Sequence, residues 1–205
     1  MTPASFVEEL AKVSLPRVFN PYADTCPEAD DKQSASIRCR NLIEYLEAAS
    51  SRRPPLWVAR DLGYRGGRRT GIALTDESCL PVLNDVWGLR LAKATRGAVV
   101  SERTARVVWR LVIEMPQPPF LWNVFPFHPH EPGNGMTNRQ HSANERRLGL
   151  VFLNSISEIL DPQIVVAIGN DAERALGEED GKVFKVRHPS YGGESAFIAG
   201  IRQFK

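Results

Sequence analysis

The sequence has few cysteines and no long apolar run. Its 205 residues include three cysteines, Cys26, Cys39 and Cys79, which are too few and too widely spaced for a disulfide framework, a four-thiolate metal site or an iron–sulfur cluster. No apolar run reaches the roughly 18 residues that a membrane-spanning helix needs, and the N-terminal segment is acidic rather than basic. We therefore expect a protein of a reducing compartment, the cytoplasm, that needs no cofactor and does not associate with a membrane.

Lysine is also scarce, and this gives the charge a particular character. Lysine and arginine together number 26 against 24 acidic residues, for a formal net charge of +2, but only 6 of these basic residues are lysine. Arginine is preferred where a planar, bidentate contact to phosphate or carboxylate is needed, and it clusters here at 38–69 and 139–147. This pattern fits a modest nucleic-acid footprint, and it fits an ordinary solvated surface equally well.

Strands and helices are predicted to alternate along the chain. Short apolar runs rich in β-branched or aromatic residues predict buried strands at Leu56–Arg60, Phe120–Phe125, Ile164–Ile168 and Val183–Val186. Apolar residues at helical spacing predict helices at Ala35–Ala49, Arg103–Ile113, Asn144–Leu160 and Asp171–Leu176. The alternation predicts an α/β fold, with one domain over residues 1–205 built as a three-layer sandwich, in which helices flank a central four-stranded, mainly parallel sheet.

Polar side chains lie in or directly after each predicted strand. Asp61 follows the first strand, Asn123 lies within the second, Gly169-Asn170 follows the third and His188 comes shortly after the fourth. In open parallel sheets, ligands bind beyond the carboxyl ends of the strands. The sequence therefore predicts that a carboxylate, an amide and an imidazole converge on one crevice.

At these residues the sequence resembles the uracil-DNA glycosylase superfamily. The best-known branch of that superfamily has a water-activating G-Q-D-P-Y loop, a base-reading Asn in a middle strand and a late H-P-S loop. Here Ala59-Arg60-Asp61-Leu62-Gly63, Leu121-Trp122-Asn123 and His188-Pro189-Ser190 stand at those places, in the order found in the family. The matching region covers residues 56–193, about two thirds of the chain.

The resemblance implies a monofunctional uracil-DNA glycosylase of base-excision repair, which flips uracil out of DNA and hydrolyses its N-glycosidic bond. Asp61 would orient the attacking water and stabilise the sugar cation, and His188 would stabilise the uracil anion. The Asn123 amide would accept from uracil N3–H and donate to O4, a pattern that cytosine reverses. The expected partner is uracil-containing DNA, single- or double-stranded, bound by a monomer.

The sequence departs from the family at three places around the expected base pocket, which also includes Leu62. Arg60 stands where relatives have Gln or Glu, and Leu74 stands where they stack a Phe on the base. Gly63 stands where strict uracil enzymes have a Tyr that collides with the thymine methyl group. Tyr64 is the nearest residue that could take over the exclusion of thymine.

Two groups of residues are expected to contact DNA. Arg65, Arg68 and Arg69 lie in a glycine-rich loop suited to gripping phosphates on both sides of an extruded nucleotide. Gly169, Asn170 and Ser190 offer donors to phosphate oxygens, and Tyr191 is the candidate to fill the space that the flipped base leaves.

Other interpretations of the same residues remain. Asp61 could cap a turn, with Asp76 and Glu77 as spare carboxylates, and Asn123 could be a strand amide bonded to nearby backbone. A zinc site at His128, His130 and His141 is disfavoured, because these residues lack the helical spacing of the common hydrolytic zinc motif. The alternative functions are a DNA-binding module without catalysis and a glycosylase for another deaminated base, such as hypoxanthine or xanthine.

Overall fold

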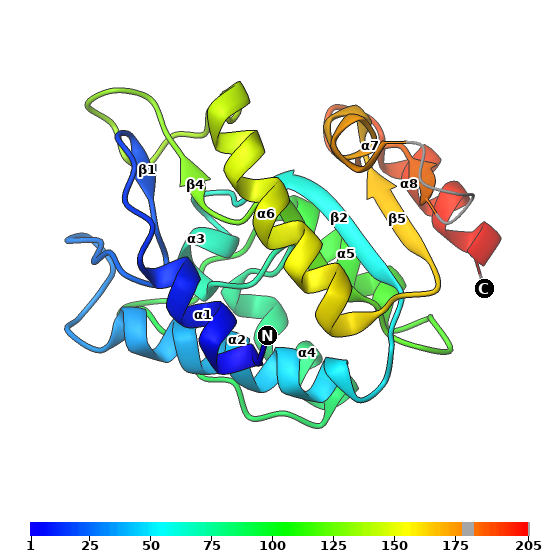
Figure 1. Cartoon of the computed structure of the whole chain (residues 1–205), viewed down its shortest axis with the longest axis horizontal. Coiled ribbons are helices and arrows are strands. Elements are labelled where there is room, and N and C mark those ends of the chain that lie inside the picture. Colours follow the sequence, from blue (N-terminus) through cyan, green and yellow to red (C-terminus); the bar gives the residue numbers. More distant parts are fainter. Residues whose placement is uncertain (178–182, 205) are drawn as a thin grey trace.

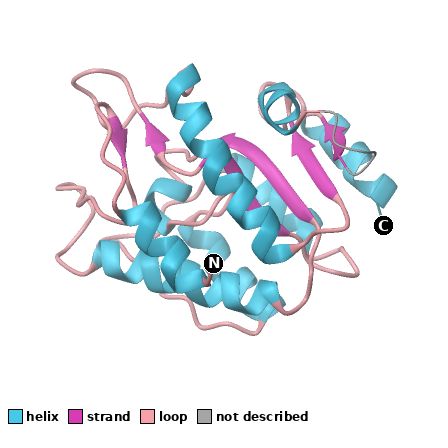
Figure 2. Ribbon diagram, viewed as in Figure 1, coloured by secondary structure: helices cyan, strands magenta, loops and turns pink. Residues whose placement is uncertain are grey.

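The computed structural model describes residues 1–177 and 183–204 (Figures 1 and 2). Its α-helices are α1 (Pro3–Ala11), α2 (Ser34–Ser50), α3 (Gly67–Thr70), α4 (Leu80–Trp87), α5 (Arg103–Val112), α6 (Ala143–Leu160), α7 (Asn170–Leu176) and α8 (Glu194–Ile201). Its strands are β1 (Val18–Phe19), β2 (Leu56–Asp61), β3 (Phe120–Phe125), β4 (His128–Pro129), β5 (Val165–Ile168) and β6 (Val183–Val186). Short 3₁₀ turns lie at Glu77–Cys79 and Arg202–Phe204.

The central sheet has the strand order β3-β2-β5-β6, and all of its neighbouring strands are parallel. This confirms the predicted α/β fold, and each predicted strand agrees with the observed one to within one residue at either end. A separate antiparallel ribbon pairs β1 with β4. Within the described parts of the chain, no helix has the length and apolarity needed to cross a membrane.

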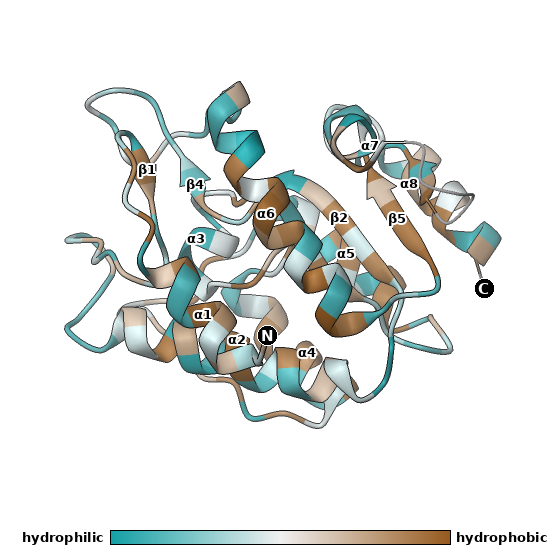
Figure 3. Ribbon diagram, in the orientation of Figure 1, coloured by the Kyte–Doolittle hydropathy of each residue, from teal (hydrophilic) through white to brown (hydrophobic). Residues whose placement is uncertain are grey.

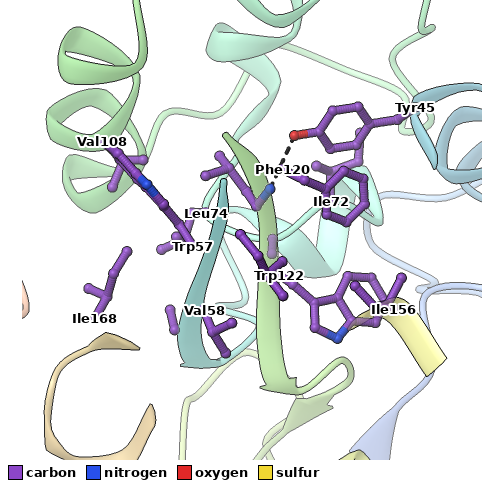
Figure 4. Close-up of a cluster of buried hydrophobic side chains, with 14 of the residues drawn as sticks. Tyr45, Trp57, Val58, Ile72, Leu74, Val108, Phe120, Trp122, Ile156 and Ile168 are labelled. Carbon is purple, nitrogen blue, oxygen red and sulfur yellow. Dashed lines mark hydrogen bonds between the residues drawn. The ribbon is translucent and has the colours of Figure 1, made fainter. Parts of the chain in front are cut away.

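Helices cover both faces of the sheet, with α6 in front of it and α5 behind it in Figure 1. On one face the Trp122 ring packs 5.7 Å from the Phe6 ring of α1, and on the other the Trp57 ring lies 6.4 Å from the Phe197 ring of α8. Figure 4 shows Trp122 beside Ile156 of α6. Because both faces are covered, the strands read as nearly continuous apolar runs rather than alternating ones, as β5 shows in Figure 3.

The start of α6 is fixed close to the carboxyl end of β3. Ser142 caps the helix by accepting from the Glu145 N–H, and the Glu145 carboxylate accepts from the Ser142 N–H in return. Gly149 allows the helix to approach the strand, because a Cβ there would lie 2.1 Å from the Val124 carbonyl oxygen. The segment before α6 is thereby held beside the end of β2.

Candidate active site

A crevice of about 440 Å³ opens at the carboxyl ends of β2, β5 and β6. In Figure 1 the arrowheads of β2 and β5 point toward the end of the molecule where α6 and α7 begin. Residues predicted from the sequence that line the crevice are Arg60, Asp61, Leu62, Gly63, Leu74, Gly169, Asn170, His188, Ser190 and Tyr191. The structure therefore brings the predicted carboxylate and imidazole to one cavity.

Asp61 is the last residue of β2, and its side chain is buried between two nitrogen groups. Its Oδ2 accepts from the Arg60 Nε–H at 2.8 Å, and its Oδ1 makes a short contact with the Nδ1 of His141. Arg60 also reaches Asp171, with 3.3 Å between Nη1 and Oδ2. The contacts hold the carboxylate at the crevice and join it to His141, which sequence reasoning considered only as a zinc ligand.

His188 is held in one tautomer by the residue two positions later. Its Nδ1 accepts from the Ser190 backbone N–H at 3.1 Å and lies 2.7 Å from the Ser190 Oγ. Burial lowers the pKa of His188 to about 4, and the charges of Arg60 and Arg187 add to this effect. The ring is therefore neutral at pH 7, and because Nδ1 accepts, Nε2 carries the proton.

Gly169 allows the loop after β5 to lie against the His188 side chain. It has a φ of +90°, and a Cβ at this position would lie 3.2 Å from the Cβ of His188. Arg187 is exposed and lines the crevice next to His188, although the sequence did not single it out. Ser190 has an additional role that was not predicted, since it orients His188.

Asn123 carries a buried amide whose hydrogen-bonding capacity is unused. The residue is 1% exposed, and within the described residues neither Nδ2 nor Oδ1 has a hydrogen-bond partner. It pairs with Ala59 across the parallel strands, so both side chains project from the same face of the sheet. Ala59 lines the crevice, whereas Asn123 is not among the lining residues. The alternative in which backbone groups satisfy this amide is not observed.

We expect the change Asn123→Leu to raise the free energy of unfolding by about 1–3 kcal/mol. The reason is that it removes a buried amide whose loss of hydration no hydrogen bond compensates. Chemical denaturation measures the difference. Asn41→Leu is the matched control, since Asn41 is equally buried but bonds both the N–H and the carbonyl of Ala92. That variant should be less stable than the wild type. Equal losses in the two variants would contradict the interpretation of Asn123.

The glycine-rich loop after β2 does not present all three of its arginines to solvent. Arg65 is exposed, but Arg68 is buried, with its guanidinium 3.6 Å from the Phe19 ring centroid and its Nη1 3.0 Å from the His128 Nδ1. Arg69 is buried against Glu77, with 3.2 Å between Nε and Oε2. These two arginines brace the loop from inside, because their partners come from distant segments. Arg65 is therefore accessible to a phosphate, whereas Arg68 and Arg69 are not.

The histidines considered for zinc have other roles. His128 lies in the β1–β4 ribbon, where burial and the Arg68 charge lower its pKa to about 3. Its Nε2 lies 2.8 Å from the Thr137 carbonyl oxygen. Among the residues described, no three His, Cys, Asp or Glu side chains are grouped in a way that could hold a metal ion.

The spare carboxylates have structural roles. Asp76 caps the turn at Glu77–Cys79 by accepting from the Cys79 N–H at 2.9 Å, and it also accepts from the Glu102 N–H. Glu77 accepts from the Val100 N–H at 2.8 Å and pairs with Arg69. Both are almost fully buried, so they fix the segment before α5 onto the glycine-rich loop.

The three remaining predicted residues lie at different depths. Leu74 is nearly buried in the crevice wall and has a φ of +52°. Tyr64 lies outside the residues that line the crevice, and its N–H donates to the Asn138 Oδ1 at 3.0 Å. Tyr191 is 98% exposed at the crevice, with a φ of +52°.

Glu102 is a crevice residue that sequence reasoning missed. Burial raises its pKa to about 6, and the nearby Asp76 charge adds to the shift while Arg65 opposes it. The sequence offered one signal, a carboxylate at the position preceding a helix, and this signal is too common to be specific.

Glu102→Gln is expected to stabilise the protein at neutral pH but not at acidic pH. A carboxyl group with a raised folded-state pKa contributes stability below its unfolded pKa, and this is lost as pH rises through about 6. The variant does not titrate, so its advantage should grow between about pH 4 and pH 7 to on the order of 1 kcal/mol. Thermal unfolding across this range measures it, with Glu158→Gln on the exposed side of α6 as the control. A pH-independent difference would be the contrary result.

No protein-family model matches the sequence, and no curated protein matches it. Among solved structures, the crystal structure of wild-type SMUG2 from Pedobacter heparinus matches with a TM-score of 0.64 at 13% sequence identity. The match covers 100% of this chain and 95% of that one. The chain therefore shares the fold of that protein.

Proposed function

We propose that this protein is a monofunctional DNA glycosylase that hydrolyses the N-glycosidic bond of uracil in DNA. The observation that carries the proposal is the meeting of Asp61 and His188 in one crevice, together with the buried, unpartnered amide of Asn123, which pairs in register with Ala59 of the crevice lining. Its fold likeness to SMUG2, a glycosylase of the uracil-DNA glycosylase superfamily, supports a DNA glycosylase at the coarse level.

Cleavage of the bond develops positive charge on the sugar and negative charge on the base. Asp61 supplies an anion for the sugar side, and its contacts with Arg60 and His141 hold it in one orientation while it positions the attacking water. His188 supplies a neutral donor for the base side through Nε2–H, which stabilises negative charge developing on O2. Water adds to the sugar carbon and loses a proton to the Asp61 carboxylate. The bond to the base nitrogen breaks with its electron pair, and the base leaves as the anion.

Asn123 provides the means to recognise uracil. Its Oδ1 accepts from N3–H and its Nδ2 donates to O4, so uracil satisfies both unpartnered atoms. Cytosine presents a donor and an acceptor in the opposite order, which would leave two buried polar groups unpaired. Uracil gives both buried amide atoms of Asn123 a hydrogen-bond partner and cytosine gives them none, so the amide favours uracil over cytosine.

The crevice rim suits a flipped nucleotide. Tyr191 projects into solvent and can occupy the space that the extruded base leaves in the duplex. Arg187 is an exposed cation of the crevice lining, and Arg65 is an exposed cation in the loop after β2, so both are suitable for binding phosphates. The crevice lining also offers hydrogen-bond donors to DNA phosphate oxygens at Gly169, Asn170 and Ser190.

The test is incubation of the purified protein with labelled oligonucleotides, single- and double-stranded, that carry uracil, hypoxanthine, xanthine or only normal bases. Alkali-labile abasic sites at uracil, formed in the presence of EDTA, are the expected result. Binding to uracil-containing DNA with no abasic site would favour the non-catalytic module. Cleavage at hypoxanthine or xanthine alone would reassign the substrate.

A further inference from the structure

Two glycines of the loop after β2 leave room for the Glu102 carboxyl group. A Cβ at residue 63 would lie 2.7 Å from the Glu102 Oε1, and one at residue 66 would lie 2.2 Å from its Oε2. The three atoms nearest to such a Cβ at residue 63 all belong to the Glu102 carboxyl group. Gly63 is therefore not an opening in the crevice wall, because Glu102 occupies the volume that a side chain there would take.

The position of Glu102 is fixed through its backbone, and its side chain is left unpaired. Its N–H donates to buried Asp76, which in turn caps the preceding 3₁₀ turn. The side chain does not cap α5, and in the described parts of the chain its carboxyl oxygens have no hydrogen-bond partner. The group is thus held in the crevice wall by the fold while its polar atoms remain available.

The chemistry of a pyrimidine ring determines which edge meets this wall. C5 lies directly across the ring from C2, so a base whose O2 accepts from His188 directs its C5 away from His188. His188 follows β6, whereas Gly63 follows β2, and β5 separates these two strands in the sheet. The C5 edge of a base bound in this way is therefore directed toward the side of the crevice that Gly63 and Glu102 line.

We propose that Glu102 is the specificity-determining residue that excludes thymine, because its carboxyl group fills the space beside Gly63 that a C5 methyl would need. The inference rests on the proposed function. Uracil and thymine present the same edge to Asn123, so only a contact at C5 can separate them. A methyl at this place would collide with the carboxyl group and would also remove its remaining contact with water.

The experiment compares excision of thymine and uracil, each opposite guanine, by the wild type and a set of variants. Glu102→Ala and Glu102→Ser both empty the space, and Ser also suits the position before a helix. Each should raise the ratio of thymine to uracil excision by about 10-fold or more, the value of one methyl group in a tight pocket. Glu102→Gln preserves the volume and should leave the ratio low, and so should Tyr64→Ala, since Tyr64 lies outside the crevice lining.

Refilling the space from the other side provides the decisive control. The backbone of Gly63 does not adopt a positive φ, so residue 63 accepts a side chain once Glu102 is shortened. Gly63→Leu combined with Glu102→Ala adds as many heavy atoms as the second change removes, and it should return the ratio to the wild-type value. An unchanged ratio in both short variants, with uracil excision retained, would overturn the role of Glu102. Absence of uracil excision in the wild type would instead overturn the proposed function and this inference with it.

Discussion

Asp61→Asn is expected to slow uracil excision by about 10²–10⁴-fold, the range for loss of a general base. The change removes the anion that faces the sugar but preserves the size of the side chain. The uncharged amide of the variant should not balance the positive charge that develops on the sugar in the transition state. It is also too weak a base to take a proton from the attacking water. Single-turnover cleavage of a uracil-containing oligonucleotide measures the loss.

DNA affinity provides the control for this variant. Fluorescence anisotropy should show binding close to that of the wild type, since Asp61 is buried and contributes no attraction for phosphate. Asp85→Asn makes the same chemical change on an exposed position of α4, away from the crevice lining, and should leave cleavage unchanged. Cleavage by Asp61→Asn at the wild-type rate would exclude Asp61 as the catalytic carboxylate.

His188→Ala is expected to slow excision by about 10²–10³-fold, as for the loss of one donor to a developing oxyanion. The pH profile carries a further expectation. The pKa of His188 is lowered to about 4, so the imidazole ring is neutral throughout the pH range in which excision would be measured. The ratio of wild-type to variant rates should therefore stay constant between about pH 5.5 and pH 8.

The ratio separates His188 from every other titrating group, because groups such as Glu102 remain in both proteins and cancel. His130→Ala serves as the matched variant, since His130 lies outside the crevice lining and its Nδ1 lies 3.0 Å from the neighbouring Glu131 carbonyl oxygen. A ratio that rises as pH falls through about 6.5 would show that the imidazolium is the active form.

The strands and the order of the polar residues after them were predictable because their signals are local. An apolar run bounded by turns reports a strand that is covered on both faces, and β3 matches its predicted bounds at both ends. Asp61 and His188 were predicted to share a crevice for the same reason, since ligands bind at the ends of parallel strands, and both residues line it. Helices α1, α3, α4 and α8 were missed, because each has at most nine residues and so shows few turns of the helical period.

The tertiary structure decided which polar groups are free and which are paired. The sequence of the glycine-rich loop indicated three phosphate-binding arginines. In the folded protein, however, Arg68 is buried against the Phe19 ring and Arg69 is buried against Glu77. Sequence alone gave no reason to place His141 beside Asp61 or Glu102 beside Gly63. A chain segment determines its own conformation and polarity through nearest neighbours, whereas burial and pairing depend on atoms that distant segments bring close, and those exist only in the folded molecule.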